Sequence, residues 1–309
     1  MDRELWTIVM ASIHSASRAV IDCGRRPTWP NWLIVAMELW RVWHGRTLSW
    51  ACDRTHYGDL FRPRKRTSDG RCLPSISQFS RRVKSEAVQW ILQRVDDDLS
   101  RRGVNTGAVR FVDGKALPVS PVSKDPDATS GHVAGGWAKG YKLHAFVGAD
   151  RRIQAWSVVP LNTSELTVAA EMLPYLRPAA DGLGLTLGDS YYDAAPLHKA
   201  TAAATGDRLL TPLKSQQRVG PDGRHPETLR RMGPQRREAL EVWEEFPALA
   251  KSVLKQRNNI EGVFSVLTVA CGLALPPCVR RLERVRRWVG VKIILYHARL
   301  CAQERAAAA

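Results

Sequence analysis

The spacing of apolar residues changes near residue 108, and this change limits the folds that the chain can adopt. Before it, apolar residues recur at the three- and four-residue spacing of amphipathic helices. After it, they alternate or run together in short segments, with helical stretches between some of them. The predicted strands are 108–113, 141–147, 153–159, 184–189 and 208–212. The sequence therefore predicts a mixed α/β fold, a sheet flanked by helices, preceded by an all-helical domain.

Three acidic residues stand at informative places in this pattern. Asp113 closes the apolar run AVRFVDGK, Asp189 closes the run in GLTLGDSYYD, and Glu261 lies in the helical stretch QRNNIEGVFSVL. If the first and fourth strands are neighbours, Asp113 and Asp189 meet, and the helix with Glu261 can pack beside them. Carboxylates held close together cannot all stay ionised unless a cation neutralises them. Such oxygen ligands suit Mg²⁺ or Mn²⁺, and a pair of these ions is typical of in-line phosphodiester displacement.

Each acid also has a simpler interpretation. An aspartate at a strand end commonly forms a turn or caps a helix. Glu261 has Arg257 one helical turn before it as a salt-bridge partner. Asp193, four residues after Asp189, is interpreted as a helix cap.

Five sequence motifs around these acids occur in a fixed order along the chain. They are VDGKALPV (112–119), GYKLHAFVGADRRIQAWSVVPLNTSE (140–165), LGDSYYD (187–193), LLTPLK (209–214) and RNNIEGVF (257–264). Together they resemble the DDE transposases of bacterial insertion sequences, whose catalytic domain is ribonuclease H-like. The resemblance implies that Asp113, Asp189 and Glu261 are the catalytic carboxylates and the ligands of Mg²⁺ or Mn²⁺, with two ions bound.

The same resemblance implies phosphate contacts near the acids. Arg257 matches an arginine that relatives place four residues before the glutamate, and its planar fork suits a bidentate phosphate contact. Lys115 and Lys142 are expected near the site, where they would contact DNA phosphate. Relatives often carry a tyrosine and a lysine where this chain has Leu254 and Thr268, so contacts carried over from those two positions are in doubt.

The chain of 309 residues has a formal net charge of +16, which favours a polyanionic partner such as double-stranded DNA. Residues 1–104 are expected to form a helical, helix-turn-helix-like DNA-binding domain. In it, a short helix after Ser75 has an apolar face with Ile76, Phe79 and Val83 and an outer face suited to groove reading. The DNA-binding candidates are Gln78, Arg81 and Arg82 on this helix and Arg62, Arg64, Lys65 and Arg66 in the basic loop before it.

Residues 105–309 are expected to form the ribonuclease H-like catalytic domain. Within it, 120–138 reads as a long polar loop and 214–247 as a short basic insertion. From Arg280 the chain continues as a basic amphipathic helix, a second candidate DNA surface.

The six cysteines show no zinc-ligand spacing. The first residues lack a signal-peptide pattern, and no apolar run is long enough to span a membrane. We therefore expect a reduced, cytoplasmic, nucleoid-associated protein.

The sequence favours a transposase that cuts DNA at the terminal inverted repeats of its element and transfers the cut strand to target DNA, working as a homodimer on the DNA. One alternative is a metal nuclease on the same fold that cuts without strand transfer. Another is a non-catalytic DNA-binding protein derived from a transposase, which the intact set of acids disfavours. Inverted repeats flanking the reading frame would separate the first possibility from the other two.

Overall fold

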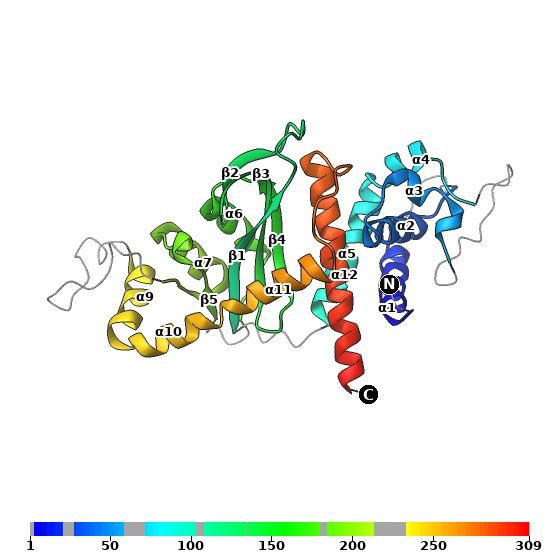
Figure 1. The fold of residues 1–309 in the computed structure, drawn as a ribbon. Coiled ribbons are helices and arrows are strands. Elements are labelled where there is room, and N and C mark those ends of the chain that lie inside the picture. The colour runs from blue at the N-terminus through cyan, green and yellow to red at the C-terminus, as the bar shows by residue number, and fades with distance from the viewer. Residues whose placement is uncertain are drawn as a thin grey trace. The chain divides into compact units, whose positions relative to one another are not determined.

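The computed structural model describes residues 3–20, 28–58, 72–102, 108–133, 135–179, 184–212 and 233–308 (Figure 1). The chain divides into two compact units. The helical unit comprises residues 1–103, 266–279 and 283–309, and the sheet unit comprises residues 104–265 and 280–282. The C-terminal segments of the expected catalytic domain are thus grouped with the N-terminal helices.

Helices build this unit, and the longer ones, α1, α2 and α5, bury the apolar faces that their sequence spacing predicts. From the N-terminus they are α1 (Arg3–Arg18), α2 (Asn31–Trp43), α3 (Leu48–Ala51), the 3₁₀ turn η1 (Arg54–His56), α4 (Ile76–Arg82), α5 (Glu86–Arg101) and the greater part of α12 (Leu282–Ala308).

Helix α12 belongs to the helical unit through buried polar contacts as well as apolar packing. The Lys292 ammonium donates to the Val42 carbonyl at 2.7 Å, and His297 Nδ1 lies 2.9 Å from Asp96 Oδ1. Arg287 Nε lies 3.4 Å from the fully buried Glu38 of α2. Because a buried charge is costly without a partner, these pairs make α12 part of this unit's core.

A mixed sheet forms the centre of the other unit. Its strands are β1 (Val109–Pro118), β2 (Thr129–Val133), β3 (Gly136–Gly148), β4 (Ile153–Pro160), β5 (Leu185–Leu187) and β6 (Arg208–Leu210). The strand order is β2-β3-β1-β5-β6, with β4 on the remaining edge of β3. β1 pairs antiparallel with β3 and parallel with β5, which is the adjacency that the sequence predicts for its first and fourth strands.

Strand β2 was not expected, because it lies in the segment 120–138 that reads as a polar loop. Its sequence TSGHV has no apolar alternation. It exists as a strand because it pairs antiparallel with the start of β3, from Thr129 opposite Gly140 to Val133 opposite Gly136. Pairing between strands, rather than burial of one face, determines this element.

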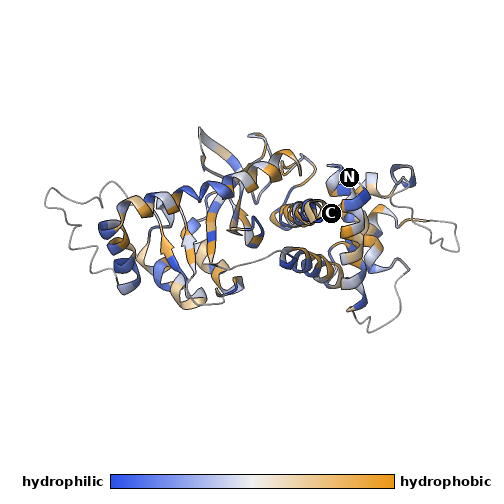
Figure 2. Cartoon of the chain, turned by 90° about the horizontal axis from the view of Figure 1, so that it is seen from below, coloured by the Kyte–Doolittle hydropathy of each residue, from blue (hydrophilic) through white to orange (hydrophobic). Residues whose placement is uncertain are grey.

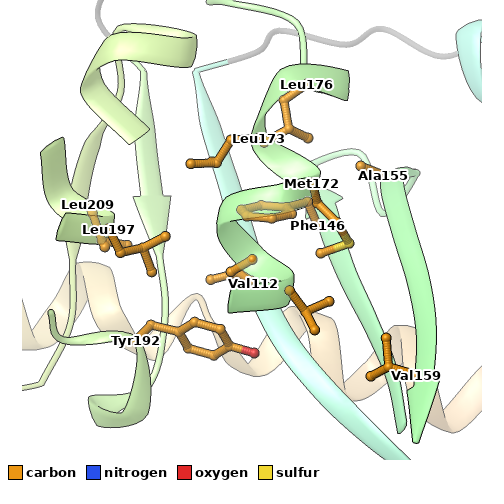
Figure 3. Close-up of a cluster of buried hydrophobic side chains, with 12 residues drawn as sticks. Val112, Phe146, Ala155, Val159, Met172, Leu173, Leu176, Tyr192, Leu197 and Leu209 are labelled. Carbon is orange, nitrogen blue, oxygen red and sulfur yellow. The ribbon is translucent and has the colours of Figure 1, made fainter. Parts of the chain in front are cut away.

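Both faces of the sheet are covered. On one face lie α6 (Glu165–Met172), the 3₁₀ turn η2 (Leu173–Tyr175) and α7 (Ala195–Thr205). Their apolar side chains meet Val112 and Phe146 in the buried cluster of Figure 3. The first half of α11 (Asn258–Val269) lies on the opposite face (Figures 1 and 3). The sheet is therefore enclosed, as expected for strands with runs of apolar residues.

Buried ion pairs fix β6 to β1 and the described part of the expected insertion to α7. Arg110 of β1 contacts Asp207 at 2.8 Å, and both side chains are fully buried. Asp193 is not the helix cap that the sequence predicts, since it accepts from Arg236 at 2.7 Å and lies 3.3 Å from His198. Arg236 stands on α9 (Pro234–Glu245), whose many hydrophilic residues are visible in Figure 2, and α10 (Pro247–Lys255) follows.

Across the described ranges, no helix combines the length and the apolar character that a membrane span requires.

Candidate active site

Parallel pairing of β1 with β5 brings two aspartates to the same edge of the sheet. Phe111 is the residue opposite Leu187, the last of β5. Asp113 comes two residues after Phe111, and Asp189 comes two residues after Leu187. Because β1 and β5 run in the same direction, the two aspartates lie at equivalent positions along the two chain segments. Because side chains two apart share a face, Asp113 lies on the face of Phe111.

Backbone donors orient both aspartates. Asp113 Oδ1 accepts from the Gly114 amide at 2.8 Å, and Asp189 Oδ1 accepts from the Tyr191 amide at 2.8 Å. The second contact makes Asp189 the N-cap of the 3₁₀ turn η3 (Ser190–Tyr192). The interpretation of a strand-end aspartate as a cap is thus correct for Asp189, and it does not exclude a role for its other oxygen.

Burial opposes ionisation of both groups. Burial raises the pKa of Asp113 to about 6, and the charges of Asp189 and Glu165 add to the rise, while the Gly114 amide and Arg257 oppose it. Burial also raises the pKa of Asp189, with a further contribution from Glu165. Perturbed carboxyl groups of this kind cluster at functional sites.

Glu261 is joined to Asp113 through Arg257. The Arg257 guanidinium places Nη1 3.2 Å from Asp113 Oδ2 and Nη2 3.5 Å from Glu261 Oε1. The Glu261 side chain is 60% exposed, whereas that of Asp113 is 18% exposed. Arg257 is therefore the partner of Glu261 that the simpler interpretation predicts, and it is also a partner of Asp113.

Glu165 is a fourth acid at this site, and it is not among the acids that the sequence predicts. It stands in the first turn of α6, and its charge raises the pKa of Asp113, Asp189 and Tyr192. Lys142 balances it, with Nζ 2.5 Å from Glu165 Oε1. Its place in the first turn of the helix that follows β4 was a signal, but acids are common in first turns because they interact favourably with the helix dipole.

The segment beside Asp113 is packed tightly against β3. A Cβ atom on Gly114 would lie 2.9 Å from Lys142 Cδ and 3.3 Å from His144 Cε1, so a larger residue would displace these side chains. Burial lowers the pKa of His144 to about 4, which keeps the ring neutral at neutral pH. The His144 side chain is fully buried.

The donor set fits a hard divalent cation in type. Asp113 on β1 and Asp189 just after β5 offer carboxylate oxygens, and Glu261, which shares Arg257 with Asp113, offers a third carboxylate. In the part of the chain that the structure describes, no three acidic, histidine or cysteine side chains converge on one point as a complete cation site. Asp113 and Asp189 are brought together by the strand pairing, whereas Glu261 is linked to Asp113 only through Arg257 among the described contacts.

The predicted DNA-contacting residues have different surroundings. Lys115 is half-buried on β1, on the face that carries Asp113, and Lys142 is engaged by Glu165. Residues 62–66 lie outside the described ranges.

On α4, Phe79 is buried as expected, but Ile76 is 50% exposed, so the prediction of its burial is wrong. Helix α4 begins one residue after Ser75, and Ile76 is its first residue, where the short helix does not reach the core. Gln78 completes a capping box with Ser75, and Arg82 donates to Asn31 Oδ1 at 2.5 Å. Arg81 is exposed.

Comparison with known proteins identifies the family of the chain. A search of curated proteins finds no match. The sequence model of a family described as "Transposase DDE domain" matches residues 105–297, which includes all three predicted catalytic acids. The match covers more than half of the chain, and the chain therefore belongs to the DDE transposase family.

Proposed function

We propose that the chain cuts DNA at the ends of an insertion sequence and joins those ends to target DNA, in a reaction that requires Mg²⁺ or Mn²⁺. The observation that carries the proposal is the pairing of β1 with β5, which sets Asp113 beside Asp189, together with the Arg257 bridge from Asp113 to Glu261. Membership of the transposase family supports the same reaction class.

Asp113, Asp189 and Glu261 would hold the metal, with two ions as the expected number. When bound, such ions activate the attacking hydroxyl and stabilise the leaving oxygen. In the cleavage step, the oxygen of water forms a bond to phosphorus while the bond from phosphorus to the 3′ oxygen breaks. In strand transfer, the freed 3′ hydroxyl attacks a target phosphodiester, and the target strand leaves with its own 3′ hydroxyl.

The basic side chains near the acids would hold the phosphates. Arg257 suits a bidentate contact because its guanidinium is planar, and Lys115 is on the face of β1 that carries Asp113. Lys142 would act chiefly by holding Glu165, to which it is already paired.

The sheet with helices on both faces is compatible with a ribonuclease H-like catalytic core. The helical unit would bind the terminal inverted repeats, using Arg81, Gln78 and Arg82 of α4 and the loop residues Arg62, Arg64, Lys65 and Arg66. The net charge of +16 supports DNA as the partner. A homodimer on DNA, and an association with the nucleoid in the cytoplasm, complete the proposal.

The test uses the full chain and duplex DNA that carries the inverted repeats flanking its reading frame. We expect Mg²⁺-dependent nicking at the repeat ends and covalent joining of those ends to a supercoiled target plasmid. Nicking without joining would identify a metal nuclease. Specific binding without either product would identify a non-catalytic DNA-binding protein.

A further inference from the structure

Arg257 contacts two carboxylates of the proposed metal site at once. Nη1 lies 3.2 Å from Asp113 Oδ2, and Nη2 lies 3.5 Å from Glu261 Oε1. The backbone amide of Arg257 donates to the Leu254 carbonyl at 3.0 Å, so the turn between α10 and α11 determines where this side chain begins. One planar group therefore joins an acid of the sheet to an acid of the helix.

A divalent cation held by Asp113 and Glu261 would need the same two carboxylates. Mg²⁺ binds oxygens at about 2.0–2.1 Å in a near-octahedral arrangement. The guanidinium lies farther from the same oxygens, at 3.2 Å and 3.5 Å, where its positive charge would repel a metal ion bound to them. Arg257 and the metal are therefore competitors for these two residues.

The Arg257 side chain can reach other partners. It is 22% exposed, and its partner Glu261 is 60% exposed, so solvent screens the pair with Glu261. A guanidinium fork fits phosphate oxygens as well as carboxylate oxygens. A DNA phosphate at the site would therefore compete with the two carboxylates for Arg257, just as the metal competes with Arg257 for the carboxylates.

We propose that Arg257 couples DNA binding to metal loading. Without DNA, Arg257 holds Asp113 and Glu261 and weakens metal binding; when a DNA phosphate takes the guanidinium, the two carboxylates become available to the metal. This inference rests on the proposed metal-dependent function. Since coupling between two ligands is reciprocal, metal binding strengthens DNA binding to the same degree.

The first measurement is a titration of the full chain with Mn²⁺ alone, followed by the EPR signal of free Mn²⁺. We expect Arg257→Ala to bind Mn²⁺ more tightly than wild type, by about fivefold or more, which is the lower range of coupling between sites. Arg208→Ala is the matched control. It removes the same charge from the same unit, at the start of β6, where Arg208 pairs with Glu238 and lies opposite Leu185 rather than the acids. Its Mn²⁺ affinity should equal that of wild type.

The second measurement is fluorescence anisotropy of a labelled duplex carrying the element's end, in Ca²⁺ and in EDTA. Ca²⁺ should strengthen DNA binding more for wild type than for Arg257→Ala. The inference is overturned if Ca²⁺ increases the DNA affinity of the two proteins equally. It is also overturned if Arg257→Ala binds Mn²⁺ no more tightly than wild type. Weaker Mn²⁺ binding would mean that Arg257 assembles the metal site instead. If wild type does not bind Mn²⁺, the proposed function is overturned as well. If wild type binds Mn²⁺ tightly and Asp113→Asn and Asp189→Asn do not, the proposed function stands whatever the outcome for Arg257.

Discussion

Asp113 and Asp189 each follow by two residues a paired position of adjacent parallel strands, Phe111 of β1 and Leu187 of β5, with Asp113 inside β1 and Asp189 just after the end of β5. Each carboxylate is oriented by a backbone amide of its own segment, at 2.8 Å in both cases. Burial raises the pKa of both groups, so the fold holds two acids where their charge is unfavourable. Such an arrangement costs stability, and it is typical of a site kept for its chemistry.

The first prediction concerns this cost. The pKa of Asp113 is raised from 3.8 to about 6 by burial, so the folded state holds the proton more tightly than the unfolded state. The free energy of unfolding therefore falls as the pH rises from about 4 to about 6. The asparagine of Asp113→Asn cannot ionise. We expect this variant to be more stable than wild type at pH 8 by only about 1–2 kcal/mol, because solvent screens part of the unfavourable charge of the partly exposed aspartate.

Thermal unfolding of wild type and Asp113→Asn between pH 4 and pH 8 measures this effect. The difference should shrink toward zero at pH 4, where both proteins carry a neutral side chain. A difference that does not depend on pH would contradict the assignment of the raised pKa to Asp113.

The second prediction concerns Glu165. Its charge raises the pKa of both Asp113 and Asp189, so Glu165→Gln should let these aspartates ionise at lower pH. The pH at which Mn²⁺ binding is half-maximal should then shift downward. Glutamine keeps a polar side chain that can accept from Lys142. The control is Glu171→Gln, which makes the same change at an exposed position of α6. An equal shift in both variants would mean that net charge, rather than the position of Glu165, is responsible.

The third prediction concerns the anchor of α9. Arg236 and Asp193 are both buried, with side chains 2% and 0% exposed. Arg236→Met leaves Asp193 with His198 as its remaining ion-pair partner among the described residues. We expect a loss of about 3 kcal/mol in the free energy of unfolding, because breaking a buried pair leaves an uncompensated buried charge. Urea denaturation measures it, and Arg237→Met, at the exposed neighbouring position, is the control. A loss no larger than that of the control would show that the pair is dispensable.

The sequence predicts the elements of the sheet unit that depend on local pattern. Apolar runs predict β1, β3, β4, β5 and β6, and the resemblance to a ribonuclease H-like fold implies the adjacency of the first and fourth strands, which the structure has. Strand β2 is missed because its sequence is polar and only the pairing with β3 makes it a strand. Glu165 is missed because its proximity to Asp113 depends on how α6 packs on the sheet.

Long-range packing also explains the grouping of α12. Its apolar positions predict a helix with a buried face, but no local signal says which partner buries it. The contacts of Lys292 with Val42 and of His297 with Asp96 join it to the N-terminal helices. A fragment ending at residue 104 would lack these contacts, so DNA binding by the helical unit is best measured on the full chain.

The fourth prediction separates two residues of α4. Gln78 completes the capping box of this helix, so Gln78→Ala should lower stability by about 1 kcal/mol whatever its effect on DNA. Arg81 is exposed, and Arg81→Ala should leave stability unchanged while weakening binding to all duplexes. For Arg81→Ala, the slope of the logarithm of the DNA-binding constant against the logarithm of the salt concentration should become shallower by about one unit, because one phosphate contact is lost.

Fluorescence anisotropy over several salt concentrations measures that slope, with Arg94→Ala on α5 as a control that removes the same charge from another exposed position. If Arg94→Ala flattens the slope as much as Arg81→Ala, α4 is not the DNA-contacting helix.

The fifth prediction tests the three acids together in one assay of DNA cleavage. Wild type, Asp113→Ala, Asp189→Ala and Glu261→Ala are each incubated with Mg²⁺ and DNA bearing the element's ends, and binding of the same DNA is measured in parallel. Loss of a metal ligand removes charge stabilisation from the transition state, whereas distant phosphate contacts supply most of the binding. We expect cleavage by wild type alone and similar DNA affinity for all four proteins. Cleavage at the wild-type rate by any of the three alanine variants would contradict this expectation.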